Sequence, residues 1–247
     1  MEIVGKALQA MHLVGSCVSF DPKGTSMVMR SFIILLLLCG QALTHNPVAI
    51  AAPPEPAHVV ILDFDPKALP PQVKFRGKIV TGARWRDLGG ENILLLTQTG
   101  RFRTRGKCPE GRCFDAALYA YHYVKHGNSV SLLWRLTDAQ RHCPFDLYVG
   151  FLLESLSITD VDSDGIGEST FVYKLSCRSD VSPAPLKLIM HEGATKYAIR
   201  GTTKLPSGYG GGEMVVDPAL DNADPALKAF SIEKWNQYVA EDQFEQF

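Results

Sequence analysis

The feature that most constrains the fold is a succession of short strand-like segments that runs from residue 57 to about residue 203. Nine segments rich in Val, Ile, Leu, Tyr and Phe follow one another, separated by Gly, Pro, Asp or Asn. Short runs of this composition with turn residues between them indicate β-strands. The segments are 57–64, 78–83, 92–99, 116–125, 129–137, 146–158, 169–177, 185–191 and 196–202. We therefore expect a mainly β protein built as a meander.

A weak internal repeat divides these segments into two groups. The sequence DLGGEN begins at Asp87 and DGIGES begins at Asp164, and both have the form D-x-x-G-E at a shift of 77 residues. Each copy continues with a strand, a loop and a hairpin that turns at Gly127 or Gly193. Each unit has the size of a four-stranded propeller blade, but two units cannot close a propeller. The pattern predicts two degenerate hairpin repeats, propeller-blade-like or packed as a small sandwich or open barrel.

Composition divides the chain into five expected parts. Asp224 and Pro225 form a helix start of the N-cap and N1 type, and the apolar residues that follow predict a C-terminal α-helix. The glycine-rich stretch before it lacks the GK[ST] ending of a phosphate loop, so a linker is favoured. The parts are a leader (1–51), a Pro-rich linker with the first strand (52–72), the β-repeat domain (73–204), a Gly-rich linker (205–222) and the helix (223–247).

The leader has the pattern of a secretory signal peptide whose start is Met27 or Met29. Arg30 precedes a short apolar run (32–39), and small residues at 49–51 suit the cleavage site. The run is too short to span a membrane. We expect a protein exported to the periplasm or the cell surface, with no integral membrane domain after cleavage. A balance of 25 basic against 26 acidic residues gives no global reason to bind nucleic acid.

Four cysteines remain after the leader, and an oxidising compartment makes disulfides the default. Cys108 and Cys113 flank a short turn-rich loop whose ends must lie close together, which favours their pairing. Cys143 would then pair with Cys177. Three pairings exist in principle, and a zinc site is the rival interpretation, although the spacing does not match a usual zinc knuckle.

The strongest local motif is D-x-D-x-D-G-x-G-E, from Asp160 to Glu168. Four acids within nine residues repel one another, and a hard cation turns that repulsion into coordination. Ca²⁺ accepts six to eight oxygen ligands, and a glycine after the third acid allows the sharp turn that such loops need. The predicted Ca²⁺ ligands are the side chains of Asp160, Asp162, Asp164 and Glu168 and the backbone carbonyl of Ile166. A solvated acidic turn without an ion is the alternative.

The first copy of the repeat lacks most of these acids. When the two copies are aligned on Glu91 and Glu168, the equivalents of the three aspartates are Ala83, Trp85 and Asp87. Only two acids remain of four. The sequence therefore predicts one calcium site rather than two.

The flanks of the motif distinguish between known calcium loops. An EF-hand needs flanking helices and a glutamate at position 12, where this chain has Phe171. Strand-like flanks and the acid at position 9 resemble the FG-GAP and VCBS repeats of integrin-type propellers. The stretches WRDLGGEN, from Trp85, and ITDVDSDGIGESTF, from Ile158, also resemble a bacterial family of surface polysaccharide biosynthesis proteins, over residues 73–203. This resemblance implies a place at the cell envelope and names no reaction.

The remaining candidates for chemistry are a basic rim and a histidine pair. Arg101, Arg103 and Arg105 would project from one face of a strand, and their guanidinium forks suit an acidic polysaccharide. A solvated hairpin rim is the alternative. His122 and His126 share a strand face, which we interpret as an exposed hairpin end rather than a metal pair.

The predicted function is that of an exported, calcium-binding, non-catalytic binding or assembly protein of the bacterial cell envelope, linked to surface polysaccharide. Its expected partners are an acidic polysaccharide or an envelope protein. No hydrolase, nucleotide-binding or metalloprotease fingerprint appears in the sequence. The alternative is a carbohydrate-active enzyme of unfamiliar type.

Overall fold

The computed structural model describes residues 58–109, 111–206 and 210–241. All of them belong to the compact unit formed by residues 52–247. The predicted leader (1–51) and the beginning of the Pro-rich linker lie outside the described residues.

The first sheet is antiparallel and has six strands. Its strands are β1 (Val60–Leu62), β2 (Lys78–Asp87), β3 (Gly90–Gln98), β4 (Phe102–Arg103), β5 (Phe114–His126) and β6 (Ser129–Cys143). Strands β4 and β6 both pair with Phe114, so they lie on opposite edges of β5. Strand β3 pairs with the later part of β5, on the edge away from β6. This sheet contains the whole first copy of the repeat.

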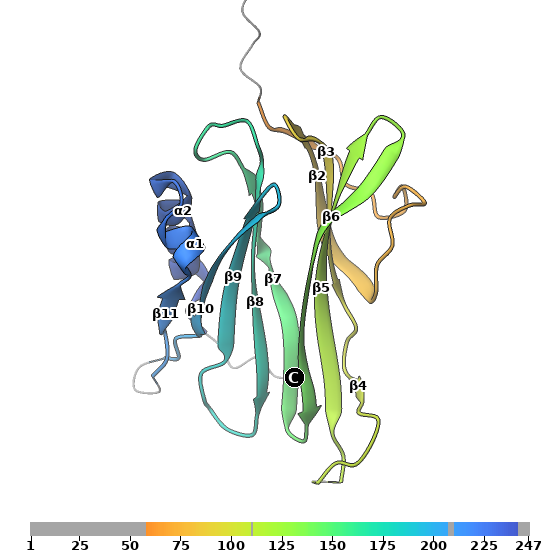
Figure 1. Cartoon of the computed structure of the whole chain (residues 1–247). Coiled ribbons are helices and arrows are strands. Elements are labelled where there is room, and N and C mark those ends of the chain that lie inside the picture. The colour runs from red at the N-terminus through yellow and green to blue at the C-terminus, as the bar shows by residue number, and fades with distance from the viewer. Residues whose placement is uncertain (1–57, 110, 207–209, 242–247) are drawn as a thin grey trace, which may run out of the picture. The chain divides into compact units, whose positions relative to one another are not determined.

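The second sheet contains the second copy and has five antiparallel strands in the order β11-β10-β9-β8-β7. Its strands are β7 (Asp146–Thr159), β8 (Glu168–Arg178), β9 (Pro185–Glu192), β10 (Thr195–Thr202) and β11 (Met214–Val216). The two sheets stand face to face in Figure 1. The fold is therefore mainly β and is a small sandwich of two sheets, which confirms the fold class expected from the sequence.

The main core fills the space between the sheets. Trp85 and Leu94 from the first sheet and Phe171 and Ile189 from the second belong to one buried apolar cluster. Each of these residues alternates along its strand with a residue of the opposite face, as the period of two requires. Burial of these apolar side chains supplies the main driving force that holds the two copies together.

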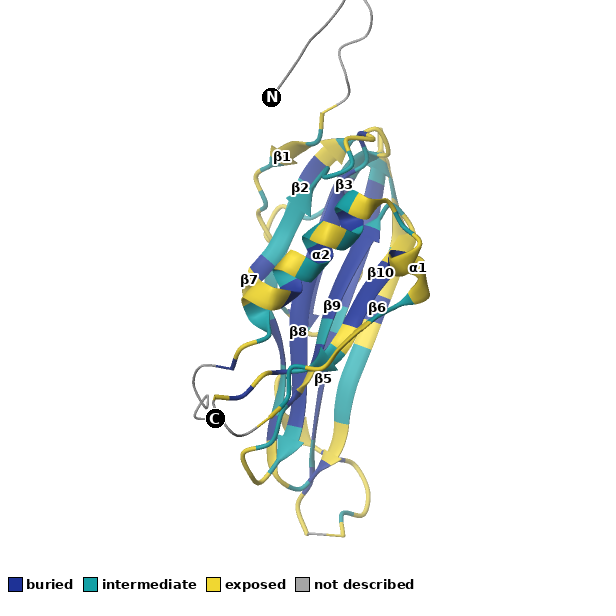
Figure 2. Ribbon diagram, turned by 90° about the vertical axis from the view of Figure 1, so that its left-hand side faces the viewer, coloured by how far each residue is buried: buried dark blue, intermediate teal, exposed yellow. Residues whose placement is uncertain are grey.

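Outer layers cover the far face of each sheet. Helix α2 (Pro225–Tyr238) lies across the second sheet in Figure 2. Its side chains Leu227 and Trp235 are buried in a cluster with residues of β9 and β10. The segment before β2 places Val73 and Leu69 on the outer face of the first sheet. Both faces of each sheet are therefore partly shielded, which explains why strand β8 is buried over most of its length.

Two disulfide bonds cross-link the described part of the chain. Cys108 and Cys113 close the loop between β4 and β5, with their Cα atoms 5.7 Å apart. Cys143, the last residue of β6, bonds to Cys177 of β8, with a Cα–Cα distance of 5.6 Å, and so joins the two sheets. These are the pairings that the sequence favours. All four thiols are used, so the cysteines are not zinc ligands.

The C-terminal region holds more structure than its composition suggests. Strand β11 and a short helix α1 (Pro218–Asp221) lie within the expected linker at 205–222. Asp217 caps α1 and Asp224 caps α2 by accepting backbone N–H bonds from Leu220 and Ala226. The short strand pairs with β10, a long-range contact that local composition does not encode.

Candidate metal centre

The acidic loop, residues 160–168, follows β7 at one end of the second sheet, and its last residue, Glu168, is the first residue of β8. Backbone N–H groups of the loop donate to its own carboxylates: Ile166 to Asp164 Oδ1 at 2.7 Å and Gly165 to Asp160 Oδ1 at 3.4 Å. Gly165 has a φ of 83°, the left-handed region that suits glycine. The turn predicted after the third acid is therefore present.

Two overlapping groups of carboxylates form around this loop. Oxygen atoms of Asp160, Asp162 and Glu168 lie within 4.8 Å of one another, and so do those of Asp162, Asp164 and Glu192. The first group contains three of the four predicted side-chain ligands. Ca²⁺–oxygen distances of about 2.3–2.6 Å allow one ion to reach three oxygens spaced in this way. Asp164 lies in the second group, which includes a residue that the motif did not predict.

Glu168 has an unusual environment for a carboxylate. Its side chain is 0% exposed, and Oε2 accepts hydrogen bonds from Thr159 Oγ1 at 2.7 Å and from the Val161 N–H at 3.1 Å. Its other oxygen, Oε1, has no hydrogen-bond partner among the described residues. Burial raises the pKa of Glu168 to about 7, because the charged form loses its hydration. A buried carboxylate oxygen without a partner is costly, and a cation would satisfy it.

Glu192 is the ligand candidate that the sequence did not identify. It ends β9, and the register of the second sheet sets it directly opposite Glu168 on β8. Like charges at directly opposite positions destabilise a sheet. Burial and the nearby charges of Asp162 and Asp164 raise the pKa of Glu192. Glu192 lies outside the D-x-D-x-D-G-x-G-E motif, beside the hairpin turn at Gly193, so only the β8–β9 register reveals it.

The acidic loop also contacts the first sheet. The Gly167 N–H donates to Asp87 Oδ2 at 3.0 Å, and the Leu88 N–H donates to the Gly165 carbonyl at 3.0 Å. Trp85 Nε1 donates to the same Asp87 oxygen at 2.8 Å. A Cβ at position 167 would stand 2.6 Å from Trp85 Nε1, so only glycine allows this approach. The loop is thus held by the first copy of the repeat.

Access to the loop is open on one side. A surface hollow of about 430 Å³ is lined by Asp160 and Ser163 of the loop and by His58 and Ile61 from the segment at β1. Asp160, Asp162 and Asp164 form no salt bridge with a lysine or arginine in the part of the chain that the structure describes. An ion from solvent would therefore meet uncompensated negative charge.

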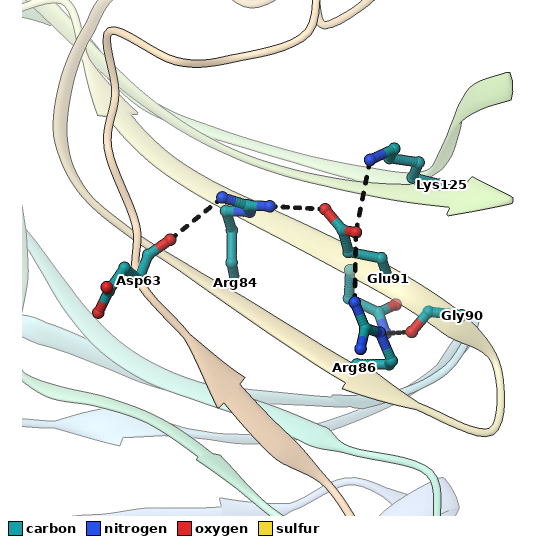
Figure 3. A network of polar contacts seen from close by, with 7 residues as sticks. Asp63, Arg84, Arg86, Gly90, Glu91 and Lys125 are labelled. Atoms are coloured by element: carbon teal, nitrogen blue, oxygen red, sulfur yellow. Dashed lines mark hydrogen bonds and ion pairs between the residues drawn. The ribbon is translucent and has the colours of Figure 1, made fainter. Parts of the chain in front are cut away.

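The glutamate of the first copy has the opposite environment. Figure 3 shows Arg84, Arg86 and Lys125 around the Glu91 carboxylate. The N–O distances to Glu91 are 2.6 Å from Arg84, 3.4 Å from Lys125 and 3.9 Å from Arg86. The hydrogen bond from Arg84 is the main cause that lowers the pKa of Glu91, with Lys125 adding to it. Three cations already surround this carboxylate. Side chains of the protein therefore already neutralise the charge of Glu91, and the single calcium site stays a prediction.

The predicted basic rim is only partly assembled on a strand. Arg101, Arg103 and Arg105 are all exposed, but β4 contains only Phe102 and Arg103. Arg101 stacks over the Phe114 ring at 3.6 Å from its centroid, while Thr104 turns inward to Asp115. Of the three arginines only Arg103 lies on a strand, so the common strand face that alternation predicts is not formed.

The interpretation of His122 as part of an exposed hairpin end is wrong. His122 is 1% exposed, whereas His126 at the end of β5 is exposed. Strand β5 lies between β3 and β6, and the second sheet covers its inner face, so a residue near its end is still buried. The two histidines therefore do not form a pair on the surface.

The described residues contain no helix that is long and apolar enough to cross a membrane. The two disulfides are typical of proteins from oxidising compartments. Comparison with known proteins found no match: no protein-family model fits the chain, and no curated protein or solved structure resembles it significantly. The resemblance to FG-GAP and VCBS repeats and to surface polysaccharide biosynthesis proteins stays a prediction. The geometry of the acidic loop is the observation that bears on function.

Proposed function

We propose that the acidic loop binds Ca²⁺ and that the protein is a non-catalytic binding or assembly component of the cell envelope. The observation that carries the calcium proposal is Glu168 Oε1, a fully buried carboxylate oxygen with no partner among the described residues. It belongs to a group whose other members, Asp160 and Asp162, reach within 4.8 Å. A cation at this position would satisfy all three carboxylates at once.

The chemistry of the ligands favours Ca²⁺ over other metals. Every candidate is an oxygen, and neither histidine nor thiol belongs to the two groups. Ca²⁺ tolerates irregular geometry with six to eight oxygens, whereas Mg²⁺ requires a near-ideal octahedron. Side chains that come from a loop and from a separate strand suit the more tolerant ion. The predicted carbonyl of Ile166 would add a neutral ligand.

Calcium would act on the fold rather than on a substrate. The ion would hold together the two ends of the acidic loop, which itself contacts Asp87 of the first sheet. Extracellular calcium modules work with dissociation constants of about 10⁻⁴–10⁻³ M. Export by the predicted signal peptide, with two disulfides formed after export, would place the chain where such a weak site is filled.

The surface partner proposed for this protein is an acidic polysaccharide. Arg101, Arg103 and Arg105 are exposed, and so are Lys107, which precedes the disulfide-closed loop, and Arg112, which lies within it. Arginine binds carboxylate and sulfate groups in a bidentate manner. Retention of the protein on an immobilised polyuronate should fall when Arg103 and Arg105 are both replaced by alanine. Unchanged retention would remove the polysaccharide from the proposal.

Isothermal titration of Ca²⁺ into the metal-free full chain tests the calcium proposal. We expect saturable binding that weakens by more than about tenfold in Glu168→Gln, because the buried charged ligand is lost. Glu154→Gln is the matched control, since Glu154 is an exposed acid of β7 outside the loop. Absence of binding in the unmodified protein, or equal affinity in Glu168→Gln, would contradict the proposal.

A further inference from the structure

One end of the first sheet carries a row of charged side chains on the face turned away from the second sheet. Trp85 belongs to the main core between the sheets, so its neighbours along β2 point outward by the alternation of a strand. The register of the sheet sets Arg86 of β2 and Lys125 of β5 directly opposite Glu91 of β3, one on each side. Glu91 is therefore flanked by a cation on both neighbouring strands (Figure 3).

The Glu91 carboxylate does not occupy all the cations around it. Arg84 donates to Glu91 Oε1 at 2.6 Å and to the Asp63 carbonyl at 3.2 Å, so its guanidinium group is engaged. Lys125 and Arg86 share the other carboxylate oxygen at 3.4 and 3.9 Å. These distances exceed the roughly 2.7–2.9 Å of a charge-assisted hydrogen bond. The two side chains are 35% and 63% exposed, so a second anion from solvent can reach both.

A surface hollow of about 410 Å³ lies at this row. Its lining consists of Arg86, Asp87, Glu91, Lys125 and His126 together with two glycines. Among the described residues, therefore, no apolar side chain borders the hollow. A hydrocarbon ligand would gain little here, whereas a ligand with many hydroxyl groups would find donors and acceptors on every side.

The charge of the hollow favours a ligand with one negative charge. Glu91 is neutralised by Arg84, which lies closest to it. The Asp87 carboxylate accepts three N–H hydrogen bonds and is held by them. Arg86 and Lys125 then bring two positive charges to the hollow against one from Asp87. A single carboxylate group between the two cations would balance this excess.

We propose that this hollow binds a sugar acid, whose carboxylate lies between Arg86 and Lys125 and whose hydroxyl groups hydrogen-bond with the polar lining. Arginine suits this role because its guanidinium group binds a carboxylate in a bidentate manner. A volume of about 410 Å³ lies within the roughly 300–1,000 Å³ of small-molecule sites, so one monosaccharide unit fits.

This hollow is separate from the arginine rim and from the acidic loop. Arg103 pairs with Phe114 at the beginning of β5, whereas Lys125 lies near the end of that strand. At roughly 3.4 Å per residue, the two positions are more than about 30 Å apart. None of the carboxylates grouped around the acidic loop lines the hollow. The proposal therefore depends neither on calcium nor on the rim.

Galacturonate is the direct probe, and galactose is its matched control because it lacks only the carboxylate. In protein-observed NMR without added calcium, galacturonate should give saturable shifts that include the backbone amides of Lys125 and Gly127. Galactose should bind roughly 10-fold or more weakly, since charge-assisted hydrogen bonds are lost. Cyclohexanecarboxylate, which has the charge without the hydroxyl groups, should also bind more weakly. No saturable shift with galacturonate, or equal affinity for either control compound, would overturn the proposal.

Trigalacturonate distinguishes the two sources of such a ligand. It should bind at least as tightly as galacturonate where the ligand is one residue of a polysaccharide, and more weakly where the ligand is a free sugar acid.

A pair of double variants tests the location. Arg86→Gln with Lys125→Gln removes both cations of the hollow and should abolish the shifts, while the rest of the spectrum reports that the fold is kept. Arg76→Gln with Lys78→Gln removes the same two charges from exposed positions at the other end of β2 and should leave affinity unchanged. Equal affinity in the Arg86/Lys125 variant and the unmodified protein, or equal loss in both variants, would overturn the proposal.

Discussion

Glu91 and Glu168 occupy equivalent positions in the two copies of the repeat, yet their carboxylates have opposite surroundings. Glu91 is bound by Arg84 and lies near Arg86 and Lys125, and its pKa is lowered. Glu168 is fully buried with one oxygen unpartnered among the described residues, and its pKa is raised to about 7. The same D-x-x-G-E pattern thus ends in one glutamate that arginine and lysine side chains neutralise and in another for which we propose a bound cation.

The local cause of this difference is the connection between the paired strands. In the first copy, only Leu88 and Gly89 separate β2 from β3, so Arg84 and Arg86 stay on a strand beside Glu91. In the second copy, residues 160–167 leave the ladder as a loop and bring aspartates toward Glu168. A tight turn therefore presents cross-strand cations, whereas a longer loop can wrap around an ion.

The largest expected effect is on calcium-dependent stability. Saturation at 100 times the dissociation constant should raise the free energy of unfolding of the unmodified protein by about 2.7 kcal/mol. Glu168→Gln should lose most of this gain, because the buried carboxylate that binds the ion is neutralised. Urea unfolding with Ca²⁺ and with chelator measures both proteins. An equal gain in the two would mean that Glu168 is not a ligand.

The second-largest expected effect comes from the contact between Gly167 of the acidic loop and Trp85 of the first sheet. Gly167→Ala places a Cβ 2.6 Å from Nε1 of Trp85, which is fully buried and cannot move aside. We expect a loss of about 1–3 kcal/mol in the free energy of unfolding, as for other overpacked sites. Chemical denaturation of the calcium-loaded protein measures it. Unchanged stability would show that the acidic loop does not depend on its contact with the first sheet.

Replacing the glutamate of the first copy should have a smaller effect that calcium does not change. Glu91→Gln leaves the neighbouring cations without their carboxylate, and we expect a loss of about 1–2 kcal/mol for this half-exposed network. The loss should be the same with Ca²⁺ and with chelator. A calcium-dependent loss would mean that the first copy also takes part in ion binding, and the contrast between the copies would fail.

The smallest expected effect is the pH dependence of the difference in unfolding free energy between the unmodified protein and Glu91→Gln. A carboxyl group whose pKa is lowered on folding contributes stability above its unfolded pKa of about 4.3, and this contribution disappears as the pH falls toward the lowered folded value. The difference in stability between the unmodified protein and Glu91→Gln should therefore be constant near pH 7 and shrink below about pH 4.5. Denaturation series at several pH values in chelator measure it. A difference that is constant down to pH 3 would contradict the assignment.

Much of the architecture could be predicted because its signals are local. Alternating apolar residues and turn residues predict strands, and the short spacing from Cys108 to Cys113 brings the two thiols close without any knowledge of the fold. The acidic motif is likewise continuous, so Asp160, Asp162 and Glu168 could be assigned together. Errors arise where the partner is distant. The sequence around His122 predicts an exposed hairpin end, because a strand's own residues do not show which other strands cover it, and His122 is buried.

The sequence by itself determined the strands, the two-copy organisation, the favoured cysteine pairs and the acidic loop. Each of these features depends mainly on short stretches of neighbouring residues. Only the tertiary structure decided that the copies form the two faces of a sandwich and that Glu192 stands opposite Glu168. It also decided that Arg84 and Lys125 neutralise Glu91. These outcomes depend on strand register across long connections, and register is set by packing of whole faces rather than by any local pattern.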